Sequence, residues 1–205
     1  MKIGLLGTGF VGQALASGFV RGGHEVRFGS RNPKQAKAPP QTRVETVRTA
    51  TEWADVVVVA VPHSAVRGTV EAAGPAAFRD KVVVDATNAL GPSGLAVGFT
   101  TSAAEELAKL IPGARVVKAF NTVFAANLAT GKIGSETLTL FVAADDAGAK
   151  ETVMRLGRDL GFDPMDAGPL RSARYLEPMA MQIMAMAFGL KRDTKIGFRL
   201  VGGSE

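Results

Sequence analysis

The chain has 205 residues and no cysteine, which excludes a disulfide framework and a thiolate metal site. Hydrophobic residues make up 46% and charged residues 21%, as is ordinary for a soluble globular protein with a sizeable core. The net charge of +5 comes from dispersed basic residues without interleaved aromatics, so the composition does not indicate a nucleic-acid partner.

No segment has the pattern of a secretory signal or a membrane span. A lone Lys2 precedes a short apolar run that continues directly into a glycine motif. The longest apolar stretch of the C-terminal half, "MAMQIMAMAFGL", contains Gln182 and is too short to cross a bilayer. We therefore expect a soluble, cytoplasmic protein that contacts no membrane.

Short β-branched runs alternate with helical patterns along the chain. The predicted strands are residues 2–7, 25–30, 54–62, 81–88, 114–120, 137–144 and 162–168. The predicted helices are residues 10–22, 46–53, 64–73, 102–110, 121–130, 146–160 and 170–190. Near-continuous apolar runs such as "VVVVAV" are typical of parallel strands buried on both faces. The alternation predicts a right-handed, doubly wound and mainly parallel α/β sheet.

Local signals mark several element boundaries. Ser102 and Glu105 have the spacing of a capping box, which predicts a helix start, and Gly161 is suited to end a helix. The polar segments 31–42 and 91–100 are predicted to be loops.

Gly7, Gly9 and Gly12 form a G-x-G-x-x-G pattern that follows the first predicted strand and opens the first predicted helix. In this context the first glycine permits a tight turn, the second lets a pyrophosphate approach the backbone, and the third allows close helix–strand packing. The free N–H groups at the helix start would face the phosphates. The pattern predicts a Rossmann-type dinucleotide site.

The end of the second predicted strand indicates which dinucleotide is bound. Folds that prefer NAD usually place a carboxylate there for the ribose 2′-hydroxyl. This chain instead has Ser30, Arg31 and Asn32, with Lys34 and Lys37 just beyond. A hydroxyl and a guanidinium would bind a 2′-phosphate that a carboxylate would repel. The sequence therefore predicts NADP(H).

Several motifs in order carry a family resemblance that runs along nearly the whole chain: "GTGFVGQAL", "GSRNP", "VVVVAVPHSAV", "VVVDATNAL", "VVKAFNTVFAANL" and "FDPMDAGPLRSARYLEP". With these motifs the chain resembles the NADPH-dependent F420 (deazaflavin) reductases and related bacterial dinucleotide-binding proteins. Those proteins are themselves similar to the cytoplasmic domain of membrane ferric reductases. The resemblance implies hydride transfer between NADPH and a small redox acceptor. We expect no metal site.

The resemblance also implies site residues. Thr8, Gly9, Phe10 and Val11 would wrap the pyrophosphate, and Ser30 and Arg31 would hold the 2′-phosphate. The remaining expected site residues lie nearer the nicotinamide and its acceptor, and they are Val61, Pro62, His63, Asn88, Ala119, Phe120, Asn121 and Thr122. Asn121, Thr122 and His63 are the candidates for the acceptor site. The deazaflavin reductases have a histidine where this chain has Asn121, which leaves the acceptor open.

Few residues could donate a proton to a carbonyl acceptor. Tyr175 is followed four residues later by Met179, so a Tyr-x-x-x-Lys arrangement is absent. His24 is expected on the surface, and Lys118, although a possible donor, is expected to point to solvent as strand-end lysines usually do. Transfer between two ring cofactors needs no positioned acid or base. This scarcity favours F420, FMN or FAD as the second substrate.

The last predicted helix is apolar almost all round, as in a buried core helix, a dimer interface or an adaptable wall for a second ring. We divide the chain into an NADP-binding Rossmann domain, residues 1–136, and an extension of the same sheet, residues 137–205, which holds the acceptor-site and interface helix. A homodimer is expected. The alternatives that remain open are a flavin, quinone or ferric reductase and an NADP(H)-binding sensor without turnover.

Overall fold

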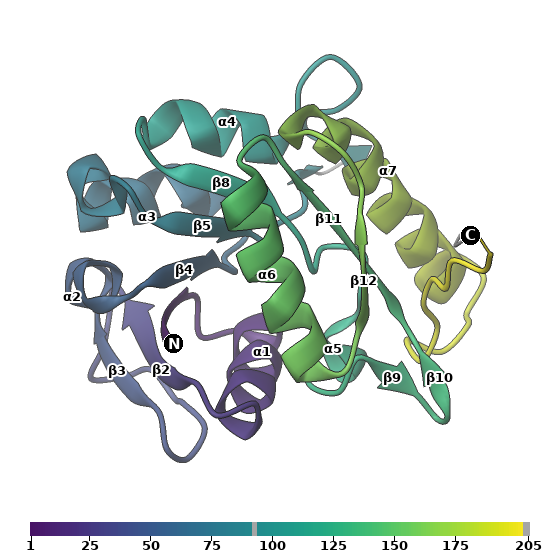
Figure 1. Cartoon of the computed structure of the whole chain (residues 1–205), viewed down its shortest axis with the longest axis horizontal. Coiled ribbons are helices and arrows are strands. Elements are labelled where there is room, and N and C mark those ends of the chain that lie inside the picture. The colour runs from purple at the N-terminus through teal and green to yellow at the C-terminus, as the bar shows by residue number, and fades with distance from the viewer. Residues whose placement is uncertain (92–93, 203–205) are drawn as a thin grey trace.

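A computed structural model describes residues 1–91 and 94–202, and its centre is an eight-stranded sheet (Figure 1). The strand order is β12-β11-β8-β5-β4-β1-β2-β3. The strands are β1 (Lys2–Leu6), β2 (Glu25–Ser30), β3 (Arg43–Thr46), β4 (Val56–Val59), β5 (Val82–Asp85), β8 (Arg115–Lys118), β11 (Thr139–Ala144) and β12 (Asp163–Asp166). The six strands from β3 to β8 are parallel, β11 is antiparallel to β8, and β12 is parallel to β11.

The strand order reverses at β1, which pairs with β2 on one side and with β4 on the other. In open α/β sheets a crevice for ligands forms at such a switch point, outside the carboxyl ends of the strands. The topology therefore confirms the predicted Rossmann-type fold and places the glycine turn after β1 at this crevice.

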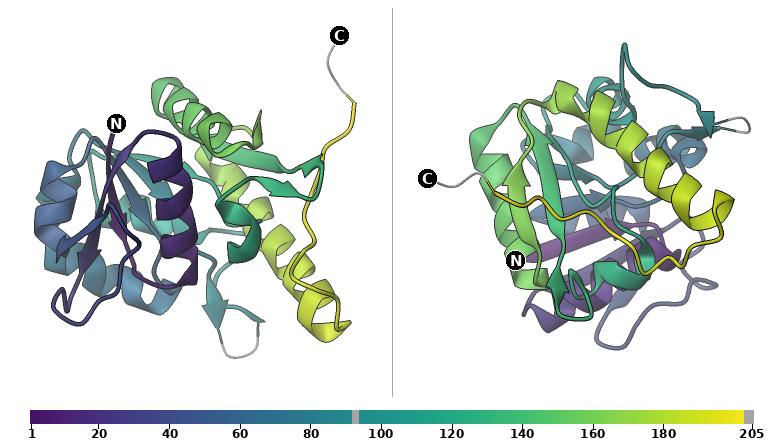
Figure 2. Two further views of the ribbon diagram at one scale, coloured as in Figure 1. Left: turned by 90° about the horizontal axis from the view of Figure 1, so that it is seen from below. Right: turned by 90° about the vertical axis from the view of Figure 1, so that its right-hand side faces the viewer.

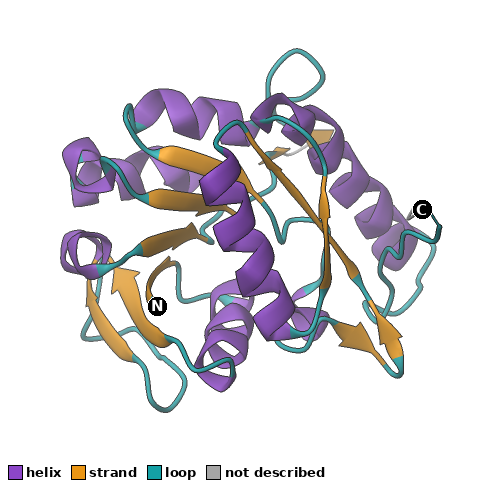
Figure 3. Ribbon diagram, viewed as in Figure 1, coloured by secondary structure: helices purple, strands orange, loops and turns teal. Residues whose placement is uncertain are grey.

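Helices cover both faces of the sheet (Figures 2 and 3). They are α1 (Phe10–Arg21), α2 (Val47–Trp53), α3 (Val66–Ala73), α4 (Ala103–Leu110), α5 (Ala125–Leu128), α6 (Ala147–Leu160) and α7 (Ala173–Met184). Helices α1, α5 and α6 share one buried cluster with the sheet, whereas α2, α3, α4 and the start of α7 share another. In the described part of the chain, no helix combines the length and apolar character needed to cross a membrane.

The valine runs of the sequence supply both cores at once. In β4, Val56 and Val58 face the α1 side, whereas Val57 and Val59 face the α3 side. Side chains of a strand alternate between faces, so a run without polar residues fits only a strand that is covered on both sides. This pattern explains why the apolar runs predicted the parallel strands well.

Two small hairpins and a returning tail complete the chain. Strands β6 (Leu90–Gly91) and β7 (Gly94–Leu95) form one hairpin, at the start of the segment predicted as a loop. Strands β9 (Lys132–Ile133) and β10 (Glu136–Thr137) form the other. After α7 the chain passes back to the start of β11, where the Thr139 N–H donates to the carbonyl of Phe198 at 2.9 Å. Residues 92–93 of the predicted loop lie outside the described residues.

Three element predictions were wrong. The edge strand β3 was missed, because a strand of four residues, two exposed and two half-buried, carries little pattern. The helix predicted at 121–130 is present only as α5, Ala125–Leu128, because Phe120 adopts a positive φ of 67° and the chain turns there. The helix predicted at 170–190 divides into a 3₁₀ turn at Leu170–Ser172, α7, and a π-helical turn at Ala185–Gly189.

His24 was also placed wrongly on the surface. Its side chain is only 8% exposed and lies at the amino ends of the strands, far from the crevice. Nε2 lies 3.1 Å from a carboxylate oxygen of Asp159, and Nδ1 lies 3.3 Å from the N-terminal amine of Met1. Burial, reinforced by the positive N-terminus, lowers the pKa of His24 below 6.5, although Asp159 opposes this effect.

The lowered pKa of His24 makes the free energy of unfolding pH-dependent. Just below pH 6.5 the unfolded chain binds a proton at this position more readily than the folded protein does. Stability should therefore decrease as the pH falls from about 7.5 to about 5.5, and His24→Gln should flatten that slope. Urea unfolding across this range measures the effect. An unchanged slope in His24→Gln would contradict the assignment.

Candidate functional site

The turn between β1 and α1 shows what each motif glycine does. Gly7 has a φ of +122°, and a Cβ there would lie 2.3 Å from the carbonyl oxygen of Ala60. A Cβ on Gly12 would lie 2.0 Å from the carbonyl oxygen of Gly7. A Cβ on Gly9, by contrast, would meet nothing within 4 Å. Packing therefore requires the first and third glycines, whereas Gly9 keeps open a space beside the backbone that a ligand can enter.

Gly9 is also the N-cap of α1. No side chain caps this helix, and no acidic residue lies in its first turn. The first N–H groups of a twelve-residue helix thus remain available, and the positive end of the helix dipole points toward the open space at Gly9. This arrangement fits an anionic group such as a pyrophosphate.

An outer hollow of about 280 Å³ lies between the glycine turn and the end of β2. Its lining residues are Gly7, Thr8, Gly9, Gly29, Ser30, Arg31, Asn32, Val47, Ala60, Val61, Pro62 and Thr69. Among the described residues, Arg31 is the one cationic side chain that lines it, and no carboxylate does. Ser30 Oγ accepts a hydrogen bond from the N–H of Asn32 at 3.1 Å, which shapes the turn. Lys34 is exposed in the following loop and does not line the hollow.

An inner hollow, also of about 280 Å³, adjoins the outer one through Gly9, Ala60, Val61 and Pro62. The other residues that line it are Phe10, Val11, Ala86, Thr87, Asn88 and Leu90. As far as the structure describes the chain, this lining is mostly apolar and contains no charged side chain. The two hollows together form one cleft at the switch point, cationic at its outer end and neutral at its inner end. Sequence reasoning missed the contributions of Gly29, Val47, Ala60, Thr69, Ala86, Thr87 and Leu90.

Asn121 is a buried link behind the inner hollow. Its Nδ2 donates to Asn88 Oδ1 at 3.0 Å and to the main-chain carbonyl of Leu176 at 2.9 Å. The main-chain carbonyl of Asn121 accepts a hydrogen bond from Asn88 Nδ2 at 3.0 Å. Asn121 therefore joins the loop after β5 to α7. The Asn121 Oδ1 and Thr87 Oγ1 atoms are buried and have no hydrogen-bond partner among the described residues. Of these two residues only Thr87 lines the cleft.

The neighbours of Asn121 lie in the core. Ala119 is fully buried, and Phe120 and Thr122 are each 2% exposed. The Phe120 ring packs edge-on against Phe19 and Phe162. The structure thus does not bring the side chains of this expected acceptor-site segment to the surface of either hollow.

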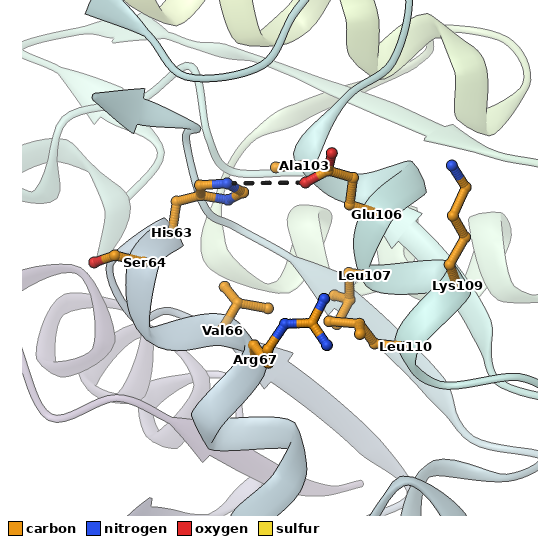
Figure 4. Close-up of a pocket in the computed structure, with 9 residues that line it drawn as sticks. All are labelled: His63, Ser64, Val66, Arg67, Ala103, Glu106, Leu107, Lys109 and Leu110. Carbon is orange, nitrogen blue, oxygen red and sulfur yellow. Dashed lines mark ion pairs between the residues drawn. The ribbon is translucent and has the colours of Figure 1, made fainter. Parts of the chain in front are cut away.

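His63 lies beyond the cleft. It begins a 3₁₀ turn, His63–Ala65, directly after Pro62, and its ring lines a groove between α3 and α4 (Figure 4). Nε2 lies 4.0 Å from a carboxylate oxygen of Glu106. The structure therefore separates His63 from the two hollows with which the sequence grouped it, although Pro62 connects them along the chain.

Lys118 does not point to solvent, contrary to expectation: its side chain is fully buried. Nζ lies 3.0 Å from an Asp85 carboxylate oxygen, 2.9 Å from a Glu177 carboxylate oxygen and 2.6 Å from the Thr87 carbonyl. The sequence held a signal that we missed, since all three charged residues interrupt apolar runs. A buried lysine enclosed in this way is not available as a proton donor to the cleft.

The buried cluster also holds α7 against α4. Glu177 accepts hydrogen bonds from the Ala103 and Ala104 N–H groups at 3.0 and 3.4 Å, at the start of α4. Arg174 donates two hydrogen bonds to Glu105, at 2.9 and 2.7 Å, and these bonds hold the pKa of Glu105 below its usual value. Ser102 caps α4 as predicted. In the described residues no group of three or more potential metal ligands is found.

Comparison with known proteins agrees with this geometry. Residues 2–89 match the sequence profile of a family described as NADP oxidoreductase, coenzyme F420-dependent. A crystal structure of a candidate F420-dependent NADP reductase from Arthrobacter sp. FB24 superposes with a TM-score of 0.90, at 29% identity, covering 98% of this chain and 100% of that one. Residues 2–89 are thus a domain of this family of oxidoreductases, and the whole chain shares the fold of that reductase structure.

Two further relatives extend the comparison. A hypothetical protein from Sinorhizobium meliloti is 30% identical, with a TM-score of 0.73, covering 84% of this chain and 87% of that one. Metalloreductase STEAP3 from Rattus norvegicus is 34% identical over 185 residues, which are 89% of this chain but 37% of the relative. The chain thus spans little more than a third of the metalloreductases that it matches.

Replacing Lys118 by methionine should leave two buried carboxylates without their cation. We expect Lys118→Met to lower the free energy of unfolding by about 3–5 kcal/mol. The matched control is Lys150→Met, which removes a 2.7 Å pair with a partly exposed Asp166 and should cost about 1 kcal/mol or less. Chemical denaturation compares the two variants, and equal losses would show that the buried cluster has no special role in stability.

Proposed function

We propose that the protein is an NADP(H)-dependent oxidoreductase that transfers a hydride between NADPH and a flavin-like acceptor, with F420 as the first candidate. The observation that carries this proposal is the cleft at the switch point. Its outer end pairs an uncapped helix start with Arg31, and its inner end is neutral and mostly apolar. Such a cleft suits a phosphorylated dinucleotide at one end and stacked rings at the other.

The outer hollow would hold the phosphates. The N–H groups that begin α1, with Thr8, Gly9, Phe10 and Val11, would surround the pyrophosphate. Arg31 would bind the 2′-phosphate through charge-assisted hydrogen bonds, next to Ser30 and Asn32. Because no carboxylate lines this hollow, nothing there favours an unphosphorylated ribose over a phosphorylated one. Lys34 could add charge from the neighbouring loop.

The inner hollow would hold the nicotinamide, which supplies the hydride when bound. Asn88 and the unpartnered Thr87 hydroxyl are the polar side chains that line it, and either can bond a neutral amide. Asn121 would act from behind by fixing the orientation of Asn88. Phe10 is 88% exposed at the rim of the hollow and offers an apolar face to an acceptor ring.

The lining of the cleft also favours a ring acceptor. Among its described residues there is no lysine, tyrosine, histidine or carboxylate that could give a proton to a carbonyl oxygen. Hydride transfer between two ring systems needs alignment and exclusion of water rather than a general acid. The chain would therefore position two partners and leave the chemistry to them.

A second candidate function is the reduction of a flavin, quinone or ferric acceptor, favoured by the similarity to STEAP3. A sensor that binds NADP(H) without turnover is the third reading.

We also propose a cytoplasmic location and a homodimer. For the dimer, the outer surface of α7 and of the chain after it carries exposed aromatic side chains, including Tyr175 and Phe188, which are 70% and 66% exposed.

Arg31→Ala should weaken NADPH binding by about tenfold to about a hundredfold, because one charge-assisted contact contributes about 1.5–3 kcal/mol. NADH binding should stay nearly unchanged. Fluorescence titration with both nucleotides measures the two affinities. Arg43→Ala, at an exposed arginine on the edge strand β3, is the control for lost positive charge. Equal losses for NADPH and NADH would show that Arg31 does not read the 2′-phosphate.

An anaerobic assay that follows NADPH absorbance identifies the acceptor. We expect oxidation of NADPH with F420, and little with NADH as the donor. Oxidation with FMN or FAD alone would favour the flavin reductase reading and make Asn121→His the next variant. If NADPH binds but no acceptor, including ferric citrate and a quinone, is reduced, the oxidoreductase proposal fails and the sensor reading is favoured.

A further inference from the structure

The groove between α3 and α4 is a second cavity, separate from the cleft just described. Its volume is about 460 Å³, and its residues are His63, Ser64, Val66, Arg67, Ala103, Glu106, Leu107, Lys109 and Leu110. Val66, Ala103 and Leu107 are buried and give it an apolar floor. Figure 4 shows polar and charged side chains arranged around that floor.

The charges around the groove are unbalanced. Arg67 on α3 and Lys109 on α4 each line it, and neither forms an ion pair or a side-chain hydrogen bond in the described part of the chain. Glu106 is the single carboxylate among the described residues of the lining, and it faces His63. Figure 4 shows the Arg67 side chain extending from α3 toward Leu110 of α4, across the groove. Donors thus outnumber acceptors around an apolar floor.

His63 provides a second, independent sign of a missing partner. Its Nδ1 atom is buried and makes no hydrogen bond with any described residue. Buried polar atoms are nearly always satisfied by protein, water or a ligand. The 3₁₀ turn that holds His63 follows directly on Pro62, a residue of the cleft. The groove therefore contains an imidazole nitrogen without a described partner, one residue along the chain from the dinucleotide site.

We propose that this groove is an anion-binding site that takes a phosphate group attached to an apolar body, with Arg67 and Lys109 as its cations and His63 beside them. The apolar part would rest on Val66 and Leu107. Two sources share this chemistry: a phosphorylated ring acceptor whose tail leaves the cleft past Pro62, and a separate phosphate-bearing small molecule. Binding in the groove does not depend on hydride transfer, and its test is therefore separate from that of the proposed function.

The chain offers a simple reporter, because it contains only two histidines. The imidazole C–H signals of His63 can be followed by NMR. Those of His24, at the amino ends of the strands, serve as the internal reference. The protein is titrated with inorganic phosphate, with FMN and with riboflavin. Each titration is performed in the presence of saturating NADP⁺ and repeated in the Arg31→Ala background, so that binding at the outer hollow is not mistaken for binding in the groove.

We expect a saturable shift of the His63 signals while those of His24 stay in place. The apparent affinity should fall at least about tenfold in Arg67→Ala and in Lys109→Ala and stay unchanged in Arg43→Ala. Saturation by inorganic phosphate identifies a site for a free anion. Saturation by FMN but not by riboflavin, which lacks the phosphate, identifies the phosphorylated tail of a ring acceptor as the group bound in the groove. No saturable shift with phosphate or FMN, or the same shift in the two groove variants, would overturn the proposal.

Discussion

The burial of one lysine, Lys118, constrains the structure at the carboxyl ends of the strands. A fully buried ammonium is tolerable only if carboxylates and carbonyls surround it, and the loss of any partner leaves an uncompensated charge. Lys118 of β8 finds one carboxylate on the neighbouring strand, Asp85, and the other on a distant helix, Glu177. The position of α7 over the sheet is therefore tied to an electrostatic requirement of strands β5 and β8, as well as to apolar packing.

This requirement reaches the cleft through a short series of hydrogen bonds. With α7 held by Glu177, the carbonyl of the preceding residue, Leu176, is in place to accept from Asn121. Asn121 in turn holds the side chain of Asn88, which lines the inner hollow. Lys118 also binds the carbonyl of Thr87 directly. The polar groups of the inner hollow thus depend on segments more than 80 residues apart in the sequence, numbered from Asp85 to Glu177.

Sequence patterns predicted what local physics decides. The valine runs, the glycine turn, the Ser102 cap and the Gly161 helix end each depend on a few neighbouring residues, and each appears where expected. Residues that depend on distant partners were harder to place. Lys118 and His24 are buried by contacts with Glu177 and Asp159, which no local pattern reveals. Phe120 turns the chain at a positive φ, so the expected helix start became a buried corner.

Charge is distributed unevenly at the carboxyl ends of the strands, and this separates the regions that would recognise a ligand from the region where a hydride would be transferred. No described residue of the inner hollow is charged, whereas the outer hollow and the α3–α4 groove beside it carry cations without described partners. A neutral, mostly apolar wall cannot select strongly between similar flat rings, since apolar contacts distinguish shape only weakly. Anionic substituents outside the rings give a stronger criterion, because each charge-assisted hydrogen bond is directional and costly to leave unmade. A chain built this way would select its partners by their phosphates and leave the rings free to exchange a hydride.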